Sequence, residues 1–424
     1  MHILRALIVA LILPAFTYAA DLDVRPGPKA ITATLARAAD GDRLILRPGI
    51  YTENIILDRP VTLQALQGAG EVVIDGNGIG STITVKGPDV VIRGLTIIGS
   101  GSAHETIDAG IKLTKTALRP VIEDNRLQGN LYGIDIHGAK DALVVGNKIE
   151  GRQDHRMNER GNGIYVWNAP GAIVDGNFVR WGRDGIFVNT SRNNRFTNNE
   201  FRDLRFGVHY MYADNSEISG NLSVGNHLGY ALMFSKKILV RDNISVDDRD
   251  HGLMFNFTTQ SDITGNYTLR GTQKCAFFYN SHKNNISGNR FEGCNIGIHF
   301  TAGSKRNHIS GNAFVGNRTQ VKYVSTQSEE WSRDGQGNYW SDFAAYDVDG
   351  DGVADTAYRP NDSMDHVLWT QPTAKLLLGS PAVQLVRWSQ AVFPALLPGG
   401  VIDSAPMMRP VEIALPKGVQ SSDR

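Results

Sequence analysis

The chain has 424 residues, with 43 basic and 43 acidic side chains, so its formal net charge is zero. A nucleic-acid binder needs a basic face that neutralises phosphates, and the balanced charge argues against that class. The chain contains only two cysteines, which excludes a disulfide framework as the source of its stability.

The first nineteen residues are predicted to be a signal peptide. Arg5 supplies a positive charge, an apolar run extends from Ala6 to Phe16, and Thr17-Tyr18-Ala19 is a small-x-small cleavage site. The apolar run is too short to span a bilayer, so we expect cleavage after Ala19 rather than a retained anchor. The mature protein is therefore expected to be exported, which in a bacterium means periplasmic or secreted.

Residues 20–40 are predicted to cap the fold that follows. Ile31, Leu35 and Ala38 share one face of a helical pattern that breaks at Gly41. An amphipathic helix at this place would cover the open edge of the first repeat.

An internal repeat occupies residues 41–325. Asn recurs mostly every 22 or 23 residues, usually after Gly or Asp, and one spacing of 30 residues contains an insertion at 151–160. The series is Asn125, Asn147, Asn177, Asn199, Asn221, Asn243, Asn266, Asn289 and Asn312. This period, with short alternating apolar runs between Gly and Asn turns, predicts an all-β fold, a right-handed parallel β-helix. Asn tolerates the left-handed turn conformation, and stacked Asn side chains can hydrogen-bond from coil to coil.

The strand that follows a Gly in each coil predicts an inward and an outward set of residues. Positions one and three after the Gly are apolar and are expected to face the core: Ile134, Ile136, Ile164, Val166, Ile186, Val188, Val208, Tyr210, Tyr230, Leu232, Leu253, Phe255, Ala276, Phe278, Ile298 and Phe300. Positions two and four are expected to face outward: Asp135, His137, Tyr165, Trp167, Phe187, Asn189, His209, Met211, Ala231, Met233, Met254, Asn256, Phe277, Tyr279, His299 and Thr301.

Imidazole and thioether groups are unusual on a solvated sheet face. His209, Met211, Met233 and Met254 are predicted to lie close together on neighbouring coils. Thioether and imidazole ligands together favour copper, and thioether favours Cu(I) in particular. The alternative is that a loop, the tail or a partner covers this apolar face.

Residues 326–365 form an aromatic and acidic closing segment. Its sequence "DVDGDGVAD" is half of a calcium loop, with candidate ligands Asp347, Asp349, Asp351 and Asp355. The twelfth position is Tyr358 rather than a carboxylate, so a full EF-hand is excluded. A bound calcium ion and a plain acidic turn both stay open.

Two further groups leave alternatives. Cys275 and Cys294 fall on adjacent coils, where either a disulfide or a thiol pair for a metal fits. Many β-helices cleave polysaccharides, which takes paired or clustered carboxylates. The best catalytic cluster here is Asp247, Asp248, Asp250 and His251, together with Asp184. The outward face itself carries one carboxylate, Asp135, and its aromatic rings can stack on sugars. We predict that the chain is not an enzyme; a carbohydrate-binding protein or polysaccharide lyase or hydrolase is the alternative.

The closing segment completes a resemblance to a known family. The signal peptide, the β-helix of the carbohydrate-binding and sugar-hydrolase type, and "GNYWSDF…YDVDGDGVADTAYRP…D" (337–365) together resemble the NosD family, periplasmic maturation proteins of nitrous oxide reductase. Phe343 is a mild departure, since Tyr is more often expected there. The resemblance implies a non-enzymatic protein that works with an ABC transporter permease, its ATPase and a copper-chaperone lipoprotein. Its implied task is assembly of the copper–sulfide centre of the reductase apo-enzyme. The resemblance assigns no catalytic residue and no metal ligand to this chain.

The same resemblance offers a role for the apolar tail, residues 366–424. Such a tail on an exported protein needs a surface to dock on, and the periplasmic face of the permease would provide one. The candidate anchors are Trp369, Leu377, Trp388, Phe393, Leu396, Leu397, Met407 and Met408. The alternative is that the tail folds back and caps the last coil.

Overall fold

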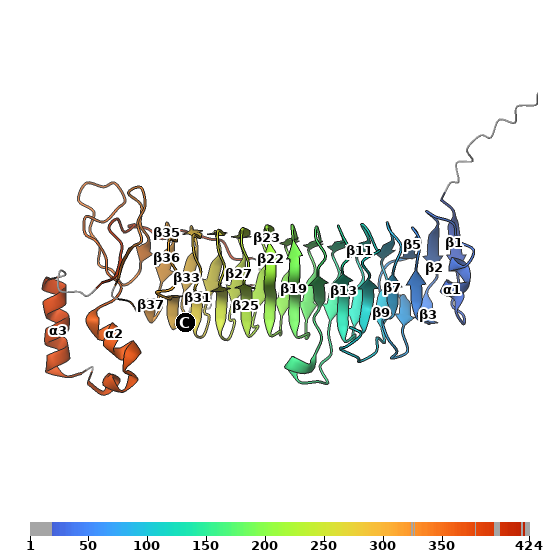
Figure 1. Cartoon of the computed structure of the whole chain (residues 1–424), viewed down its shortest axis with the longest axis horizontal. Coiled ribbons are helices and arrows are strands. Elements are labelled where there is room, and N and C mark those ends of the chain that lie inside the picture. Colours follow the sequence, from blue (N-terminus) through green and yellow to red (C-terminus); the bar gives the residue numbers. More distant parts are fainter. Residues whose placement is uncertain are drawn as a thin grey trace, which may run out of the picture.

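The computed structural model describes residues 19–323, 325, 327–377, 379–393, 399–416 and 419. Apart from Ala19, the predicted signal peptide lies outside these residues, as do Leu396 and Leu397. The described chain forms a long rod of stacked coils, with a pair of helices beyond the last coil (Figure 1). All pairings between the strands of the rod are parallel, which confirms the predicted β-helix.

Three parallel sheets run along the rod, because most coils contribute one strand to each. The first sheet contains β1 (Asp21–Val24), β2 (Arg43–Leu46), β5 (Thr62–Ala65), β8 (Val91–Arg93), β11 (Val121–Glu123), β14 (Leu143–Val145), β17 (Ile173–Asp175), β20 (Arg195–Thr197), β23 (Ser216–Ser219), β26 (Ile238–Arg241), β29 (Asp262–Thr264), β32 (Asn285–Ser287) and β35 (His308–Ser310). The second contains β4 (Ile55–Leu57), β7 (Ile83–Val85), β10 (Ala109–Leu113), β13 (Tyr132–His137), β16 (Ile164–Trp167), β19 (Asp184–Arg192), β22 (Phe206–Asp214), β25 (Leu228–Met233), β28 (His251–Asn256), β31 (Lys274–Tyr279), β34 (Ile296–Phe300) and β37 (Thr319–Tyr323). The third contains β3 (Gly49–Thr52), β6 (Val72–Asp75), β9 (Thr96–Ile98), β12 (Arg126–Gln128), β15 (Lys148–Glu150), β18 (Phe178–Arg180), β21 (Glu200–Arg202), β24 (Leu222–Val224), β27 (Ile244–Val246), β30 (Tyr267–Leu269), β33 (Arg290–Glu292), β36 (Ala313–Val315) and β39 (Tyr339–Trp340).

The N-terminal end combines a strand with a short helix. Helix α1 (Ala30–Leu35) buries Ile31 against the first coils. Strand β1 already pairs with β2, so the first sheet begins at Asp21, inside the segment predicted as a separate cap.

The core follows the predicted inward set. Every residue in that set has at most 1% of its surface exposed, and equivalent residues pair from coil to coil. Val208 pairs with Tyr230, for example, and Tyr210 with Leu232. The sequence therefore predicted correctly which residues of the second sheet face the core.

The repeated Asn residues form a continuous ladder inside the rod. Each side-chain amide donates to the next Asn carbonyl oxygen, as Asn221 does to Asn243 at 2.9 Å and Asn266 to Asn289 at 2.9 Å. The left-handed conformation that we expected at these Asn residues belongs to the preceding residue instead: Asp242 has φ 54° and Gly288 has φ 66°. This explains why Gly or Asp usually precedes the Asn.

The closing segment seals the C-terminal end of the core. Asn338 of "GNYWSD" extends the ladder by accepting from Asn312 at 2.9 Å. Trp340 stacks on Phe314 with ring centroids 4.4 Å apart and donates its indole N–H to buried Asp403 at 2.7 Å. The motif that carries the family resemblance therefore has a structural role as the end cap.

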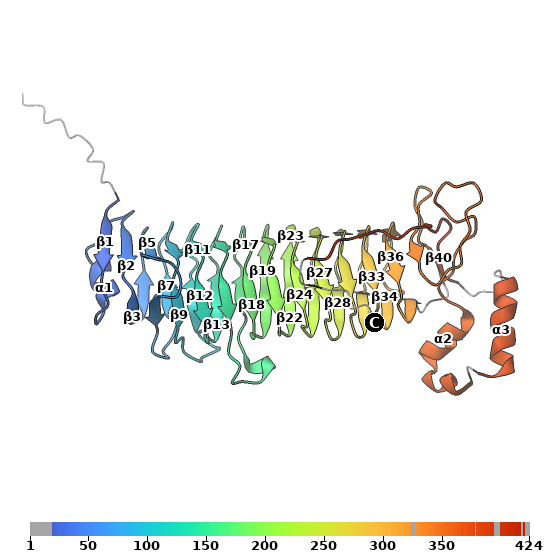
Figure 2. The same ribbon diagram turned by 180° about the vertical axis from the view of Figure 1, so that it is seen from behind.

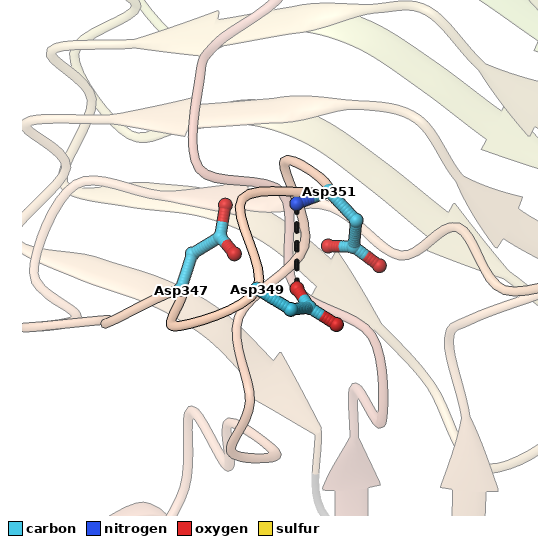
Figure 3. A group of neighbouring side chains, drawn as sticks. All are labelled: Asp347, Asp349 and Asp351. Carbon is cyan, nitrogen blue, oxygen red and sulfur yellow. Dashed lines mark hydrogen bonds between the residues drawn. The ribbon is translucent and has the colours of Figure 1, made fainter.

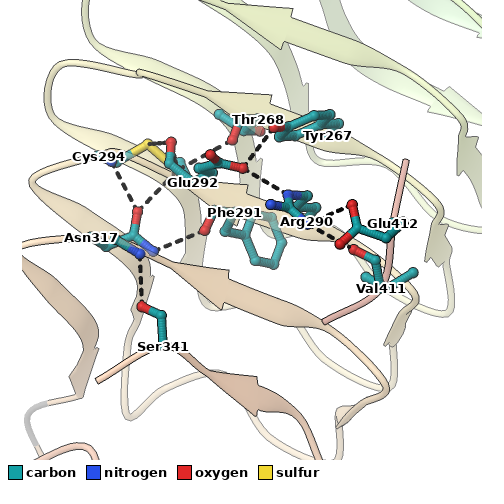
Figure 4. Close-up of polar contacts among 12 residues, drawn as sticks. Tyr267, Thr268, Arg290, Phe291, Glu292, Cys294, Asn317, Ser341, Val411 and Glu412 are labelled. Atoms are coloured by element: carbon teal, nitrogen blue, oxygen red, sulfur yellow. Dashed lines mark hydrogen bonds and ion pairs between the residues drawn. A yellow bond between two sulfur atoms is a disulfide. The ribbon is translucent and has the colours of Figure 1, made fainter. Parts of the chain in front are cut away.

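Residues 399–416, here called the strap, return over the rod. Strand β40 (Gly400–Ile402) pairs with β38 (Ser328–Glu330), and the chain then runs back along the third sheet (Figure 2). Arg290 donates to the carbonyl oxygen of Val411 at 3.1 Å and contacts Glu412 at 3.2 Å (Figure 4). Ile413 and Leu415 pack beside Tyr267 on the third sheet.

A helical arm, residues 363–392, projects beyond the last coil (Figures 1 and 2). It contains α2 (Ser363–Thr370), the 3-10 helix η2 (Pro372–Leu377) and α3 (Pro381–Val392). Ser380 caps α3 by accepting from the backbone of Val383, and Arg387 of α3 forms an ion pair with Asp362 at 3.0 Å. Among the described residues, no helix is long and apolar enough to cross a membrane.

Candidate functional site

The His and Met residues predicted to face outward lie together on the second sheet. His209 is paired with Ala231 of the next coil, and Ala231 with Met254 of the coil after it. Met211 is paired directly with Met233. With neighbouring strands about 4.8 Å apart, the four candidate ligands occupy three successive coils around the small side chain of Ala231. We call this group the His/Met face.

The ring of His209 is held rigidly. Its side chain is 9% exposed, and it lies between the rings of Phe187, at 4.8 Å, and Phe206, at 4.9 Å. The Nδ1 atom is 3.1 Å from a carboxylate oxygen of Asp184, and Arg205 binds the same carboxylate with two hydrogen bonds of 2.8 and 2.6 Å.

This arrangement determines which nitrogen of His209 is free. Burial raises the pKa of Asp184, but hydrogen bonds from His209 and Arg205 outweigh it, so the net shift lowers that pKa. An ionised Asp184 only accepts hydrogen bonds, and its 3.1 Å contact with Nδ1 is shorter than the 3.4 Å contact between Nδ1 and Nη2 of Arg205. The shorter contact favours the tautomer that carries the proton on Nδ1 and the lone pair on Nε2. Nε2 is buried and has no hydrogen-bond partner among the described residues. A carboxylate that orients a histidine in this way is the usual outer partner of a metal-binding imidazole.

The three thioethers remain accessible. Met211, Met233 and Met254 are each partly exposed, whereas Ala231 between them is buried. Methionine side chains are long and flexible, so they can converge on a point above Ala231. The described parts of the two irregular segments beside the rod attach elsewhere. Arg152 of the insertion hydrogen-bonds to Ser100, Gly101 and Ser102, and the strap follows the third sheet.

The residues of the predicted catalytic cluster each bind a structural partner. Asp248 is fully buried and accepts from Ser223 at 2.7 Å and Ser245 at 2.6 Å, and burial raises its pKa to about 7. Asp247 pairs with Arg270 at 2.7 Å. Asp184 is likewise committed to Arg205 and His209. Asp250 lies 3.2 Å from the ring of His251. Each carboxylate of this cluster therefore already has a partner among the described residues.

The outward Asp135 is also buried. Its side chain has no exposed surface, lies 3.8 Å from the ammonium group of Lys112, and has its pKa raised to about 7 by burial. The outward aromatic rings mostly stack on one another between coils, as Tyr165 does on Phe187 with centroids 5.3 Å apart and planes at 5°. Most of their faces are therefore unavailable to sugars.

The acidic loop brings three of its four candidate ligands together. Asp347, Asp349 and Asp351 offer ligand oxygens within 4.8 Å of one another on an exposed turn (Figure 3). Asp347 also accepts from the backbone of Gly350 at 2.6 Å. Asp355 lies outside this group and accepts from the backbone of Val348 at 2.7 Å.

Cys275 and Cys294 form a disulfide with Cα atoms 5.7 Å apart, which leaves no thiol pair for a metal. The bridge ties β31 to the turn after β33, beside the part of the rod that the strap covers (Figure 4).

The described docking candidates divide between two places. Leu377, Trp388 and Phe393, 58–62% exposed, belong to the helical arm or follow it directly, and half-buried Trp369 lies in α2. Met407 and Met408 lie in the strap, where the sulfur of Met407 accepts from Gln336 at 3.5 Å. The exposed apolar surface available for docking is therefore that of the helical arm.

The chain is similar in sequence to proteins of one family and in fold to a solved β-helix structure. A family model described as "Periplasmic copper-binding protein (NosD)" matches residues 145–345. Proteins named "Probable ABC transporter binding protein NosD" are 41% identical over 90% of both chains in Stutzerimonas stutzeri, and 42% identical over 88% of this chain and 89% of the relative in Pseudomonas aeruginosa. The A-module of mannuronan C-5 epimerase AlgE6 from Azotobacter vinelandii has the same fold, with a TM-score of 0.52 at 15% identity over 70% of this chain and 90% of that module.

Proposed function

The chain belongs to the NosD family, and from that premise we propose that it is a periplasmic copper-binding protein that helps to assemble the copper–sulfide centre of nitrous oxide reductase. The family description supports the periplasm and copper. The names of the relatives support association with an ABC transporter. Copper is the cargo in this proposal, and the chain itself performs no catalysis.

One observation carries the copper assignment. The Nε2 atom of His209 is buried and lacks a partner among the described residues, and the strand register places His209 next to the three methionines of the outward set. The carboxylate of Asp184, which Arg205 binds, holds the Nδ1 atom of the ring and so fixes its orientation. All four donors are neutral and three are soft, a combination that favours Cu(I) over Cu(II) and over hard cations.

The residues of the His/Met face would provide two kinds of ligand for the ion. His209 would provide the fixed ligand, because its ring is locked by stacking and by Asp184. The thioethers of Met211, Met233 and Met254 would provide ligands that move, because each is partly exposed and flexible. A site with one fixed and several mobile ligands suits a protein that receives an ion and passes it on.

We place the transporter at the other feature, the helical arm. Leu376, Leu385 and Trp388 expose 91%, 63% and 62% of their surfaces there. Large apolar side chains this exposed to water indicate a surface that a partner covers. The permease with its ATPase would bind this arm, and the copper-chaperone lipoprotein and the apo-reductase would meet the rod. Deleting residues 363–393 should abolish co-purification with the permease and leave the rod folded; unchanged recovery would refute this contact.

The acidic loop is proposed to bind calcium as a structural ion. Three carboxylates within 4.8 Å of one another on one turn repel each other unless a cation neutralises them. The loop precedes Tyr358, whose hydroxyl donates to Asp342 of the closing segment at 2.8 Å. A bound ion would therefore stiffen the end cap rather than take part in copper transfer.

The experiment that tests the function replaces thioethers without changing volume. In cells that carry Met211→Leu together with Met233→Leu, the reductase should accumulate without its copper–sulfide centre, detected by the visible absorption of the purified enzyme. Asn285→Ala, a change on the first sheet, is the matched control and should leave the reductase complete. A complete reductase in the double variant would contradict the proposed site.

A further inference from the structure

A groove at the edge of the second sheet is distinct from the His/Met face and has no role in the proposed function. Its volume is about 1170 Å³, and it crosses five coils, from Lys112 on one strand to Asp214 on the fifth. Four strand spacings of about 4.8 Å give it a length of about 19 Å along the rod. We propose that this groove binds an anionic oligosaccharide of the uronate class.

The charge of the groove differs from that of the rest of the rod. Most arginines of the coils are paired with a carboxylate on the same or a neighbouring coil, as Arg119 is with Asp89 at 2.7 Å and Arg241 with Glu217 at 2.7 Å. Lys115, Lys140 and Arg192 line the groove, and none of them forms an ion pair with any described residue. Asp214 also lines the groove and is the register partner of Arg192, but its carboxylate accepts from the backbone N–H of Lys236 at 2.9 Å and lies 3.8 Å from the ammonium group of Lys236. The groove therefore keeps a net positive charge, which favours an anionic ligand.

Two aromatic rings give the groove surfaces on which a ring-shaped ligand can stack. Trp167 stacks on His137 of the preceding coil at 4.3 Å, and its other face points toward the next coil, where Asn189 is its register partner. Tyr212 stacks on Phe234 of the following coil at 5.1 Å, so its free face points back toward the coil of Thr190.

The two rings are offset along their strands. Trp167 is in register with Asn189 and Met211, and Tyr212 is the residue after Met211, two coils or about 9.6 Å further along the rod. A sugar ring stacked on the free face of Tyr212 would therefore lie over Thr190, with Trp167 beside it. Asn189 and Thr190 occupy the coil between them and hydrogen-bond to each other at 2.8 Å. Arg192 follows on the same strand and is exposed. A pyranose ring stacked on Tyr212 would therefore lie close enough to Arg192 to present a carboxylate to it.

The backbone turn beside the groove is left-handed in one coil after another. Asn168, Thr190, Tyr212, Phe234 and Phe257 have φ between 45° and 53°, so this conformation belongs to the repeat and does not by itself mark the groove. The left-handed turn directs the exposed Tyr212 ring beside the groove rather than into the core.

Isothermal titration of the full mature chain with trigalacturonate, in EDTA to exclude calcium bridging, tests this site. Wild type should bind, and the affinity should fall with added salt and be at least tenfold lower for neutral maltotriose. Arg192→Gln and Tyr212→Ser should each weaken binding about tenfold, because one removes the charge and the other one stacking face. Arg306→Gln, an exposed cation on another coil, is the matched control and should bind as wild type does.

Three outcomes would overturn the proposal. The first is that wild type does not bind trigalacturonate at about 10 mM. The second is that the Arg192 and Tyr212 variants bind it as tightly as wild type does, with unchanged thermal midpoints. The third is that wild type binds triglutamate or adenosine monophosphate more tightly than the uronate. A Met211→Leu/Met233→Leu chain should bind trigalacturonate normally, so a failure of this site is distinguishable from a failure of the copper site.

Discussion

The Asn ladder provides a stability prediction whose size can be worked from individual hydrogen bonds. Asn289 is fully buried, and its amide donates to the carbonyl oxygen of Ile263 at 2.8 Å and to Asn312 at 2.9 Å. Its own carbonyl oxygen accepts from the backbone and the side chain of Asn266, both at 2.9 Å. The amide also donates to the carbonyl oxygen of Ser287 at 3.2 Å, and the substitution Asn289→Ala removes all five contacts at once.

The expected loss follows from the groups left without partners. At least two buried backbone groups, the N–H of Asn266 and the C=O of Ile263, lose a partner, and each costs about 1–3 kcal/mol. We therefore expect Asn289→Ala to lower the free energy of unfolding by about 2–6 kcal/mol, measured by urea denaturation followed by circular dichroism.

Asn285→Ala is the control for this measurement, because Asn285 belongs to the same coil but is only partly buried and its amide makes one weak contact with Ser287 at 3.4 Å. Its effect should stay within about 0.5 kcal/mol. An Asn289→Ala protein that unfolds at the wild-type midpoint with an unchanged slope would refute the view that the ladder holds the coils together.

Three further predictions concern other parts of the chain. Calcium should raise the thermal midpoint of wild type but not of Asp347→Asn, measured by differential scanning calorimetry; equal shifts would refute calcium binding at this loop. Replacing Cys275 and Cys294 by Ala should cost about 3 kcal/mol in urea, as expected for a bridge between residues 19 apart; no change would mean that the bridge constrains little. Burial raises the pKa of Asp248 to about 7, above the ordinary value of 3.8, so its ionisation should reduce stability as the pH rises from about 4 to about 7. Asp248→Asn should flatten that decline in pH-dependent melts, and an unchanged profile would show that other groups cause it.

The sequence was most informative where the pattern was periodic. The spacing of Asn residues and the alternation after each Gly placed Met211 beside Met233 and Val208 in the core, as the structure shows. In a parallel solenoid, register follows directly from the repeat, because a slip of one residue would exchange the inward and outward faces.

The repeat did not predict which partner each polar side chain binds, because that depends on the direction in which the side chain points. Asp184 was grouped with Asp248 in one candidate cluster, but the two buried carboxylates have separate partners: Arg205 and His209 bind Asp184, whereas Ser223 and Ser245 donate to Asp248. The available signal was the register: Asp184 pairs with Phe206, which places it one coil from His209.

The closing segment and strap were equally hard to predict. The strap has no period, and its attachment depends on single long-range contacts such as Trp340 with Asp403 and Arg290 with Val411. Sequence reasoning left open whether the tail projects or folds back. The structure shows that it does both, with the helical arm projecting and the strap returning.

The most direct test of the central proposal is anaerobic titration of the mature chain with Cu(I) against a competing chelator. Wild type should take up Cu(I), and His209→Ala and Met211→Leu/Met233→Leu should each lower the affinity by at least tenfold, since even the outer partners of a metal site are worth about 10–100-fold. Thermal midpoints close to that of wild type would show that the variants are folded. Equal Cu(I) affinity in wild type and in both variants would contradict the assignment of copper to the His/Met face.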